Sequence, residues 1–221
     1  MNPLRLTRRT SLAAALGALA LSTMSIGAVA DERPTPAEAS AFVQTLADRA
    51  IGVLNDPGTT PSVRVTAFDA LLSEGFEFDV ISRFVVGRYW NTASEPQKAD
   101  YKTLFRTFVL KKYSTLLGAY SDQRFAVTRA VEVGDRDVVV STEISQASQQ
   151  PVRADWRVRR YGNALKIIDI KVEGISMLTS QREEFTAVIQ RNGFDGLLNL
   201  LRQQTEASAS PGLPSSLASA S

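Results

Sequence analysis

The chain has 221 residues, of which 44% are hydrophobic and 22% charged, and it contains neither cysteine nor histidine. Catalysis by a Ser-His-Asp or Cys-His group, disulfide bonds and zinc sites built from nitrogen and sulfur ligands are therefore excluded. The 25 Lys and Arg residues against 23 Asp and Glu residues give a net charge of +2, and the length suits one globular domain that buries roughly 70% of its unfolded surface.

Residues 1–30 have the pattern of a secretory signal peptide. Three arginines precede an apolar stretch, and no acidic residue occurs before the small-residue triplet at 28–30. This order predicts cleavage before Asp31 and export to the periplasm by the Sec or the twin-arginine route. An uncleaved membrane anchor is the alternative, which the glycine, serine and threonine residues in the apolar stretch disfavour. Loss of the three arginines changes the net charge from +2 to −1, which removes the main support for a nucleic-acid partner.

Four helices are predicted in the first half of the mature chain. Thr35-Pro36-Ala37-Glu38 is typical of a capping box, and apolar residues at helical spacing follow it. Shorter helices are predicted to begin at Thr60-Pro61 and to span residues 78–87. The longest begins at Ser94-Glu95-Pro96-Gln97, a second capping box, and runs to about Gly118 with a broad apolar stripe.

The hydrophobic period then changes to two, as expected for β-strands. Strands are predicted at about 123–133, 136–146, 151–161 and 164–173. Their short connections indicate an antiparallel meander. Apolar and charged residues alternate along the third strand, so one face of the sheet is expected to be buried and the other solvated.

Helical spacing returns after Gly174, with Gly193 placed as a C-terminal cap before a last short helix. Residues 205–221 lack periodicity and are predicted to be a disordered tail. We therefore expect a single α+β domain at 31–204. It should have a curved four-stranded antiparallel sheet, like that of nuclear transport factor 2, wrapped by about six helices.

Asp155 and Asp169 are the candidate catalytic groups, because small enzymes of the nuclear transport factor 2 fold place an acidic base inside an apolar cavity. The alternation argues against this role, since Asp155 shares a face with three arginines and Asp169 shares one with Lys171 and Glu173. No phosphate-binding glycine loop or calcium-loop spacing occurs, so we expect no cofactor and no metal. The apolar stripes leave open a solid core, as in a ligand-free adaptor, or a pocket for an apolar ligand.

Two sets of motifs resemble the MlaC, or toluene-tolerance, family of periplasmic phospholipid-binding proteins. The first set consists of Phe78-Asp79, Phe84-Val85-Val86-Gly87-Arg88-Tyr89-Trp90, and Ser94-Glu95-Pro96-Gln97 leading into residues 101–120. The second consists of Lys166-Ile167-Ile168-Asp169-Ile170, Val172-Glu173-Gly174-Ile175-Ser176-Met177, Arg182, Phe185, and Gly193-Phe194-Asp195-Gly196-Leu197. The resemblance covers roughly residues 38–204, and the order of the motifs is the same.

The resemblance implies a monomeric lipid carrier and no enzyme. Such a carrier holds phospholipid acyl chains in an apolar pocket and exchanges lipid with an inner-membrane ABC transporter complex and an outer-membrane lipoprotein and porin complex. One branch of the family is associated with hopanoids, so a hopanoid is the alternative cargo; an acid/base enzyme using Asp169 or Asp155 is the alternative function. The side chains predicted to contact lipid are Phe84, Trp90, Leu104, Phe108, Leu117, Trp156, Val158, Ile168, Ile170, Val172, Met177 and Phe185.

Overall fold

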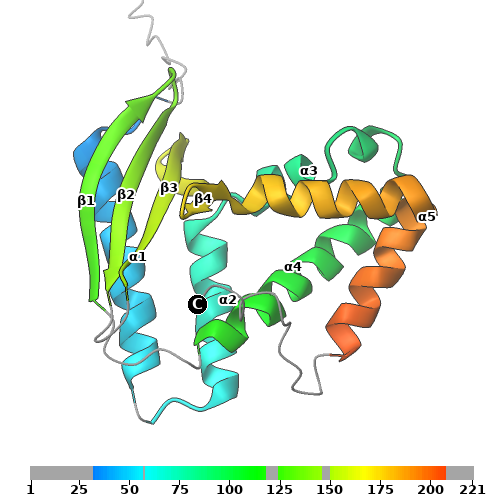
Figure 1. Ribbon diagram of the computed structural model, residues 1–221, viewed down its shortest axis with the longest axis horizontal. Helices are drawn as coiled ribbons and strands as arrows, with labels where there is room; N and C mark the ends of the chain where they lie inside the picture. Colours follow the sequence, from blue (N-terminus) through cyan, green and yellow to red (C-terminus); the bar gives the residue numbers. More distant parts are fainter. Residues whose placement is uncertain (1–31, 57, 118–123, 146–149, 208–221) are drawn as a thin grey trace, which may run out of the picture.

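The structure, a computed structural model, describes residues 32–56, 58–117, 124–145 and 150–207, except for the side chains at 114–117. The helices are α1 (Pro36–Asn55), α2 (Pro61–Gly75), α3 (Phe78–Val86), the 3-10 helix η1 (Gly87–Asn91), α4 (Glu95–Leu117) and α5 (Met177–Ala207). The strands are β1 (Arg124–Val133), β2 (Asp137–Ser145), β3 (Val152–Tyr161), β4 (Ala164–Val172) and β5 (Ile175–Ser176). Figure 1 shows the sheet and α1 at one side of the molecule and α3, α4 and α5 at the other, with α2 between them.

Both predicted capping boxes are confirmed. At the start of α1 the Glu38 amide donates to Thr35 Oγ1 at 3.2 Å, and the Thr35 amide donates to the Glu38 carboxylate at 2.8 Å. These bonds from Thr35, together with Arg160, lower the pKa of Glu38 to about 2. At the start of α4 the Ser94 amide donates to Gln97 Oε1 at 2.9 Å, and the Gln97 amide donates to Ser94 Oγ at 3.3 Å. Each box satisfies backbone N–H groups that a helix start leaves without partners.

The predicted antiparallel meander is confirmed, with strand order β1-β2-β3-β4-β5. The two-residue β5 was not predicted; it pairs Ile175 with Val172 and Ser176 with Lys171 at the edge of the sheet. The register of β3 and β4 shifts between Arg157 and Val158, so that Arg157 lies opposite Asp169 and Val158 lies opposite Ile167. Ile168 is therefore the extra residue of a β-bulge.

The predicted break at Gly193 is confirmed: its φ of 70° and ψ of 180° are non-helical and divide α5 into two helical segments. With α5 counted as one element, the described ranges contain five α-helices and one 3-10 helix. α5 also continues to Ala207, so the predicted tail begins three residues too early, and its remainder at 208–221 lies outside the described residues. The likeness to nuclear transport factor 2 stays a prediction.

Two hydrophobic clusters hold the fold together. The helical cluster joins α3, α4 and α5, and its members are Ile81, Val85, Val86, Tyr101, Phe105, Phe108, Phe185, Ile189, Leu197, Leu198 and Leu201. The sheet cluster joins α1 to β2, β3 and β4, and its members are Ala39, Val43, Val138, Val140, Val158 and Ile167. Phe76, in the connection between α2 and α3, packs against both clusters and forms a parallel bridge with Ile167. Among the described helices, none is long and apolar enough to cross a membrane.

Candidate functional site

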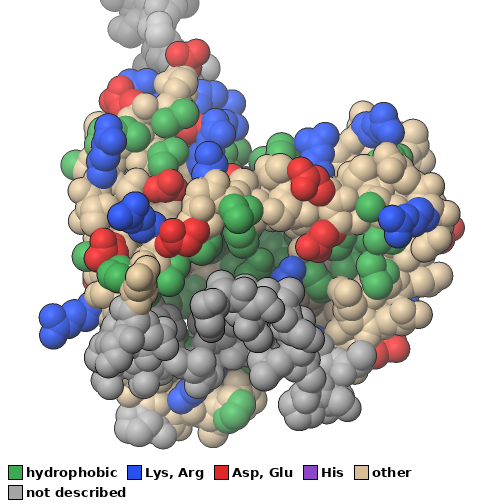
Figure 2. Space-filling model, viewed as in Figure 1, with side chains coloured by type: hydrophobic (Ala, Val, Ile, Leu, Met, Phe, Trp, Pro, Cys, Tyr) green, Lys and Arg blue, Asp and Glu red, His purple; other side chains and the backbone are tan. Residues whose placement is uncertain are grey.

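An apolar cavity of about 470 Å³ lies between the sheet and the helices. Its wall is formed by residues of α1, α2, α3, α4, all four long strands and the first turns of α5. Figure 2 shows hydrophobic side chains gathered in a hollow between the sheet half and the helical half of the molecule. A cavity of this size with a largely apolar wall suits an apolar ligand.

Two neighbouring helices supply much of the wall. α1 and α2 run antiparallel, and the ion pair between Arg49 and Glu74 at 2.5 Å ties the C-terminal half of α1 to the end of α2. On α2 the wall residues recur at helical spacing, beginning with Arg64 and Phe68. The α1 and α2 wall residues are Val43, Leu46, Ala47, Ala50, Ile51, Val53, Leu54, Arg64, Phe68, Leu71 and Leu72.

The sheet supplies the opposite side of the wall through alternating residues of β3 and β4. Ala154 and Trp156 point to the cavity from β3, and Ile170 and Val172 from β4. The bulge changes the pattern at the other end of β4: Ile167 lines the cavity and Ile168 does not. The simple alternation predicted for β4 is therefore wrong at Ile168. Because the bulge inserts one extra residue, the side chains that precede it in β4 face the opposite side of the sheet from the one that alternation predicts.

Several polar groups in this wall are bonded to protein groups. The Trp156 indole N–H donates to Thr142 Oγ1 at 2.9 Å. Gln181 accepts from Lys112 at 3.2 Å and donates to Glu184 at 2.9 Å. Arg64 differs from these groups, because its Nε is buried without a hydrogen-bond partner among the described residues.

Tyr113 adds a phenol to the same wall. Its burial, and secondarily the charge of Glu184, raise the pKa of Tyr113 above its usual value of 10.0. The phenol is therefore neutral at physiological pH, and it contributes no charge to the cavity.

Four of the predicted lipid-contacting residues lie on the cavity wall: Trp156, Ile170, Val172 and Met177. Three others, Leu104, Phe108 and Phe185, pack in or against the helical cluster. There Phe108 contacts Phe105 and Phe185, with ring centroids 6.3 and 5.9 Å apart. The wide aromatic stripe of α4 is thus used mainly to pack against α5, with Phe105, Val109 and Tyr113 reaching the cavity.

The remaining predicted residues lie elsewhere. Val158 is fully buried in the sheet cluster, and Ile168 occupies the bulge. Phe84 is 41% exposed on α3, with the Arg182 guanidinium 5.0 Å from its ring centroid. Trp90 in η1 packs edge-on against Tyr101 at 6.4 Å. The side chain of Leu117, the last residue of α4, lies outside the described part of the chain.

The largest group of wall residues that sequence reasoning missed belongs to α1 and α2. Their helical spacing was visible in the sequence, but a helix that faces a cavity has the same spacing as one that faces a solid core. Ala47 and Ala50 carried the clearest signal, because small side chains on an otherwise large apolar face leave space.

The two candidate catalytic carboxylates have structural partners. Asp169 borders the cavity, and its carboxylate accepts from Ser176 Oγ at 2.8 and 3.0 Å. Ser176 Oγ also accepts from the Thr179 amide at 3.1 Å, so the pair fixes the start of α5 to β4. Asp155 does not belong to the cavity wall, and it accepts from Ser141 Oγ at 2.6 Å on the neighbouring strand.

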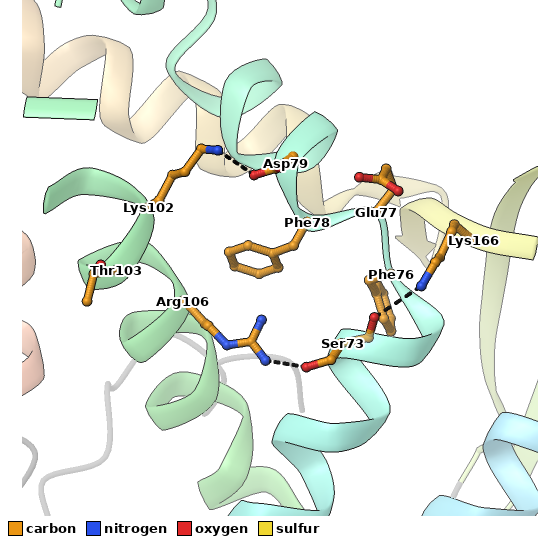
Figure 3. A pocket seen from close by; sticks show the side chains of 9 residues that line it. All are labelled: Ser73, Phe76, Glu77, Phe78, Asp79, Lys102, Thr103, Arg106 and Lys166. Atoms are coloured by element: carbon orange, nitrogen blue, oxygen red, sulfur yellow. Dashed lines mark hydrogen bonds and ion pairs between the residues drawn. The ribbon is translucent and has the colours of Figure 1, made fainter. Parts of the chain in front are cut away.

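A second, polar pocket of about 440 Å³ lies where α2, α3, α4 and β4 meet (Figure 3). Each of its three cations is paired: Lys102 with Asp79 at 2.6 Å, Arg106 with Asp69 and Ser73, and Lys166 with the Ser73 and Glu74 carbonyls at 3.1 and 2.7 Å. The bonds of Arg106 and Lys166 join the second half of α2 to α4 and β4, and the Lys102–Asp79 pair joins α4 to α3. Phe76 and Phe78 line both pockets and form the partition between them.

Comparisons with known proteins place this geometry in context. The family model described as MlaC protein matches residues 44–203. The intermembrane phospholipid transport system binding protein MlaC of Haemophilus influenzae is 25% identical over 123 residues, 54% of this chain and 58% of that protein. The chain thus spans somewhat over half the length of this relative.

Among solved structures, the phospholipid-binding protein from Ralstonia solanacearum in complex with a phospholipid matches with a TM-score of 0.69. The two sequences are 23% identical, and the match covers 78% of this chain and 99% of the other. This likeness shows a shared fold.

Proposed function

Since the chain belongs to the MlaC family, we propose that it is a lipid carrier that holds phospholipid acyl chains in the apolar cavity. The observation that carries the proposal is the cavity of about 470 Å³ between sheet and helices, whose wall is almost entirely hydrophobic. Two proteins that resemble this chain are named for phospholipid binding or transport, and one of them was determined with a phospholipid bound.

The energetics of the cavity suit a carrier. Each buried CH₂ group contributes about 0.8 kcal/mol, so acyl chains are retained in proportion to the length of chain that the wall contacts. Retention needs no catalytic group. The enzyme alternative would use Asp169, but its carboxylate is held by Ser176 at the start of α5. This arrangement favours a structural role for Asp169 over proton transfer.

The compartment and the partners belong to the same proposal. Residues 1–30 act as a signal peptide removed before Asp31, residues 31–204 form the lipid-binding domain, and the carrier moves between an outer-membrane and an inner-membrane complex in the periplasm. The mass of the protein purified from periplasm tests the cleavage site directly. A mass that includes residues 1–30 would contradict export by a cleaved signal.

Organic extraction followed by mass spectrometry tests the cargo. The protein is purified from periplasm without detergent, beside a control of similar size. Near-stoichiometric phospholipid is expected, and a hopanoid would assign the alternative cargo. A folded sample that holds no lipid and takes none up from vesicles would contradict the carrier.

The two tryptophans of the chain allow a test of where the lipid lies. Trp156 lines the cavity and Trp90 does not. In the variant Trp90→Phe, a phospholipid with brominated acyl chains should quench the fluorescence of Trp156. In the matched variant Trp156→Phe, the remaining Trp90 should be quenched little. Equal quenching in the two variants would place the lipid elsewhere.

A further inference from the structure

We propose that Arg64 binds the phosphate group of the carried lipid, so that the cavity selects lipids with an anionic phosphate ester. This inference rests on the proposed function and adds to it the residue that binds the phosphate. Arg64 is half-buried near the start of α2 and lines the cavity. Its Nε is the one buried side-chain nitrogen or oxygen of the described residues that has no hydrogen-bond partner.

The lack of a partner distinguishes Arg64 from the cations around it. Arg49 is paired with Glu74, and Arg106 is bonded to Asp69 and Ser73. Leaving a buried donor of a charged group unbonded is costly, so such donors in native proteins are almost always satisfied. A ligand that brings acceptor oxygens into the cavity would supply what the protein does not.

The position of Arg64 on α2 defines which kind of ligand fits. Phe68, Leu71 and Leu72 follow Arg64 on the same face of the helix, and all four line the cavity. At about 1.5 Å per residue, this apolar face extends about 12 Å from Arg64 to Leu72. A fitting molecule therefore has an anionic group at one end and a long apolar body.

A phosphate diester suits the guanidinium of Arg64 at the end of this apolar face. Its two free oxygens accept from a guanidinium in a planar, often bidentate geometry that a lysine does not reproduce. The start of α2 adds the positive end of a helix dipole, capped by Thr60 Oγ1, which accepts from the Val63 amide. The half-buried position of Arg64 lets the rest of a headgroup remain in water while the acyl chains lie along the wall.

The test compares two ligands with identical acyl chains, phosphatidylglycerol and diacylglycerol, bound to delipidated protein. The wild-type protein should prefer the phospholipid by about tenfold or more, as expected for hydrogen bonds to a charged group. Arg64→Met should lose this preference while still binding diacylglycerol, and Arg64→Lys should keep only part of it. Arg129→Met, which changes an exposed arginine on β1, should behave as the wild type.

The outcomes separate this inference from the proposed function. An equal preference for phosphatidylglycerol in wild type and Arg64→Met would overturn the role of Arg64 and leave the carrier intact. Failure of the wild type to bind either ligand would overturn both. Inorganic phosphate alone, at millimolar concentration, should not raise the melting temperature of the delipidated protein. A rise in wild type that is absent in Arg64→Met would assign the site to free phosphate instead.

Folding of the variant is checked by the same melting curves. Because Arg64 Nε has no protein partner, replacement by methionine should leave the delipidated protein at least as stable as the wild type. A lower melting temperature would show that Arg64 stabilises the fold, which contradicts its assignment to a ligand.

Discussion

The cavity predicts that removal of the lipid destabilises the protein. In engineered cores an empty cavity costs about 24 cal/mol per Å³. For a cavity of about 470 Å³ this scale gives an upper value of about 11 kcal/mol, comparable with the whole stability of a domain. A ligand present at about a thousand times its dissociation constant contributes about 4 kcal/mol. At about 2–4 °C per kcal/mol for a domain of this size, delipidation should lower the melting temperature by about 10 °C.

The assay is calorimetry of the loaded and the delipidated protein, with a cavity-filling variant as the decisive comparison. Ala50→Leu adds atoms to the cavity side of α1, and it should stabilise the delipidated protein by about 1 kcal/mol, roughly 3 °C, while reducing lipid uptake. The control Ala41→Leu changes an exposed position of the same helix and should do neither. Identical melting of the loaded and delipidated wild type would refute the reasoning, since a filled cavity must be more stable than an empty one.

Three further predictions concern the scaffold. Burial raises the pKa of Asp137, but hydrogen bonds from Arg159 and Arg157 outweigh it and lower the pKa below its ordinary 3.8, so Asp137→Asn should cost about 2 kcal/mol at pH 7. The difference between wild type and variant should disappear as the pH falls below about 4 and Asp137 becomes protonated in the folded wild type, because the protonated carboxyl no longer pairs with the arginines. A difference in the free energy of unfolding that is independent of pH in urea titrations would contradict this prediction. Gly87→Ala should cost about 1–3 kcal/mol in urea unfolding, because its φ of 55° and ψ of −129° are adopted almost only by glycine and the new Cβ would lie 3.0–3.2 Å from the Arg182 guanidinium; an unchanged midpoint would disprove this strain. Asp169→Asn should retain its lipid in extraction and mass spectrometry, and loss of a defined turnover instead would support an enzyme.

Local features of the sequence predicted the elements well. The capping boxes at Thr35 and Ser94 specify hydrogen bonds within four residues, and the short turns specify antiparallel neighbours. Features that depend on distant contacts were not predicted. The bulge at Ile168 and the two-residue strand at Ile175 arise from pairing between strands, which alternation along one strand does not encode.

The candidate site was harder to predict than the fold, for a physical reason. Periodicity identifies which face of a helix is buried, and both Phe108 and Val109 satisfy it on α4. Only the packing of α4 against α5 decides that Phe108 fills the helical cluster and that Val109 reaches the cavity. Arg64 was missed because an isolated arginine on a helix is ordinarily a surface residue.

The division of the interior into two clusters has a mechanical consequence. Of the described residues, Phe76 is the one that packs against both clusters. A change in the distance between the two clusters therefore disturbs few contacts inside either of them, whereas a change in the packing of one cluster disturbs many. We therefore expect ligands of different girth to change the separation of the two clusters more than the packing inside either one.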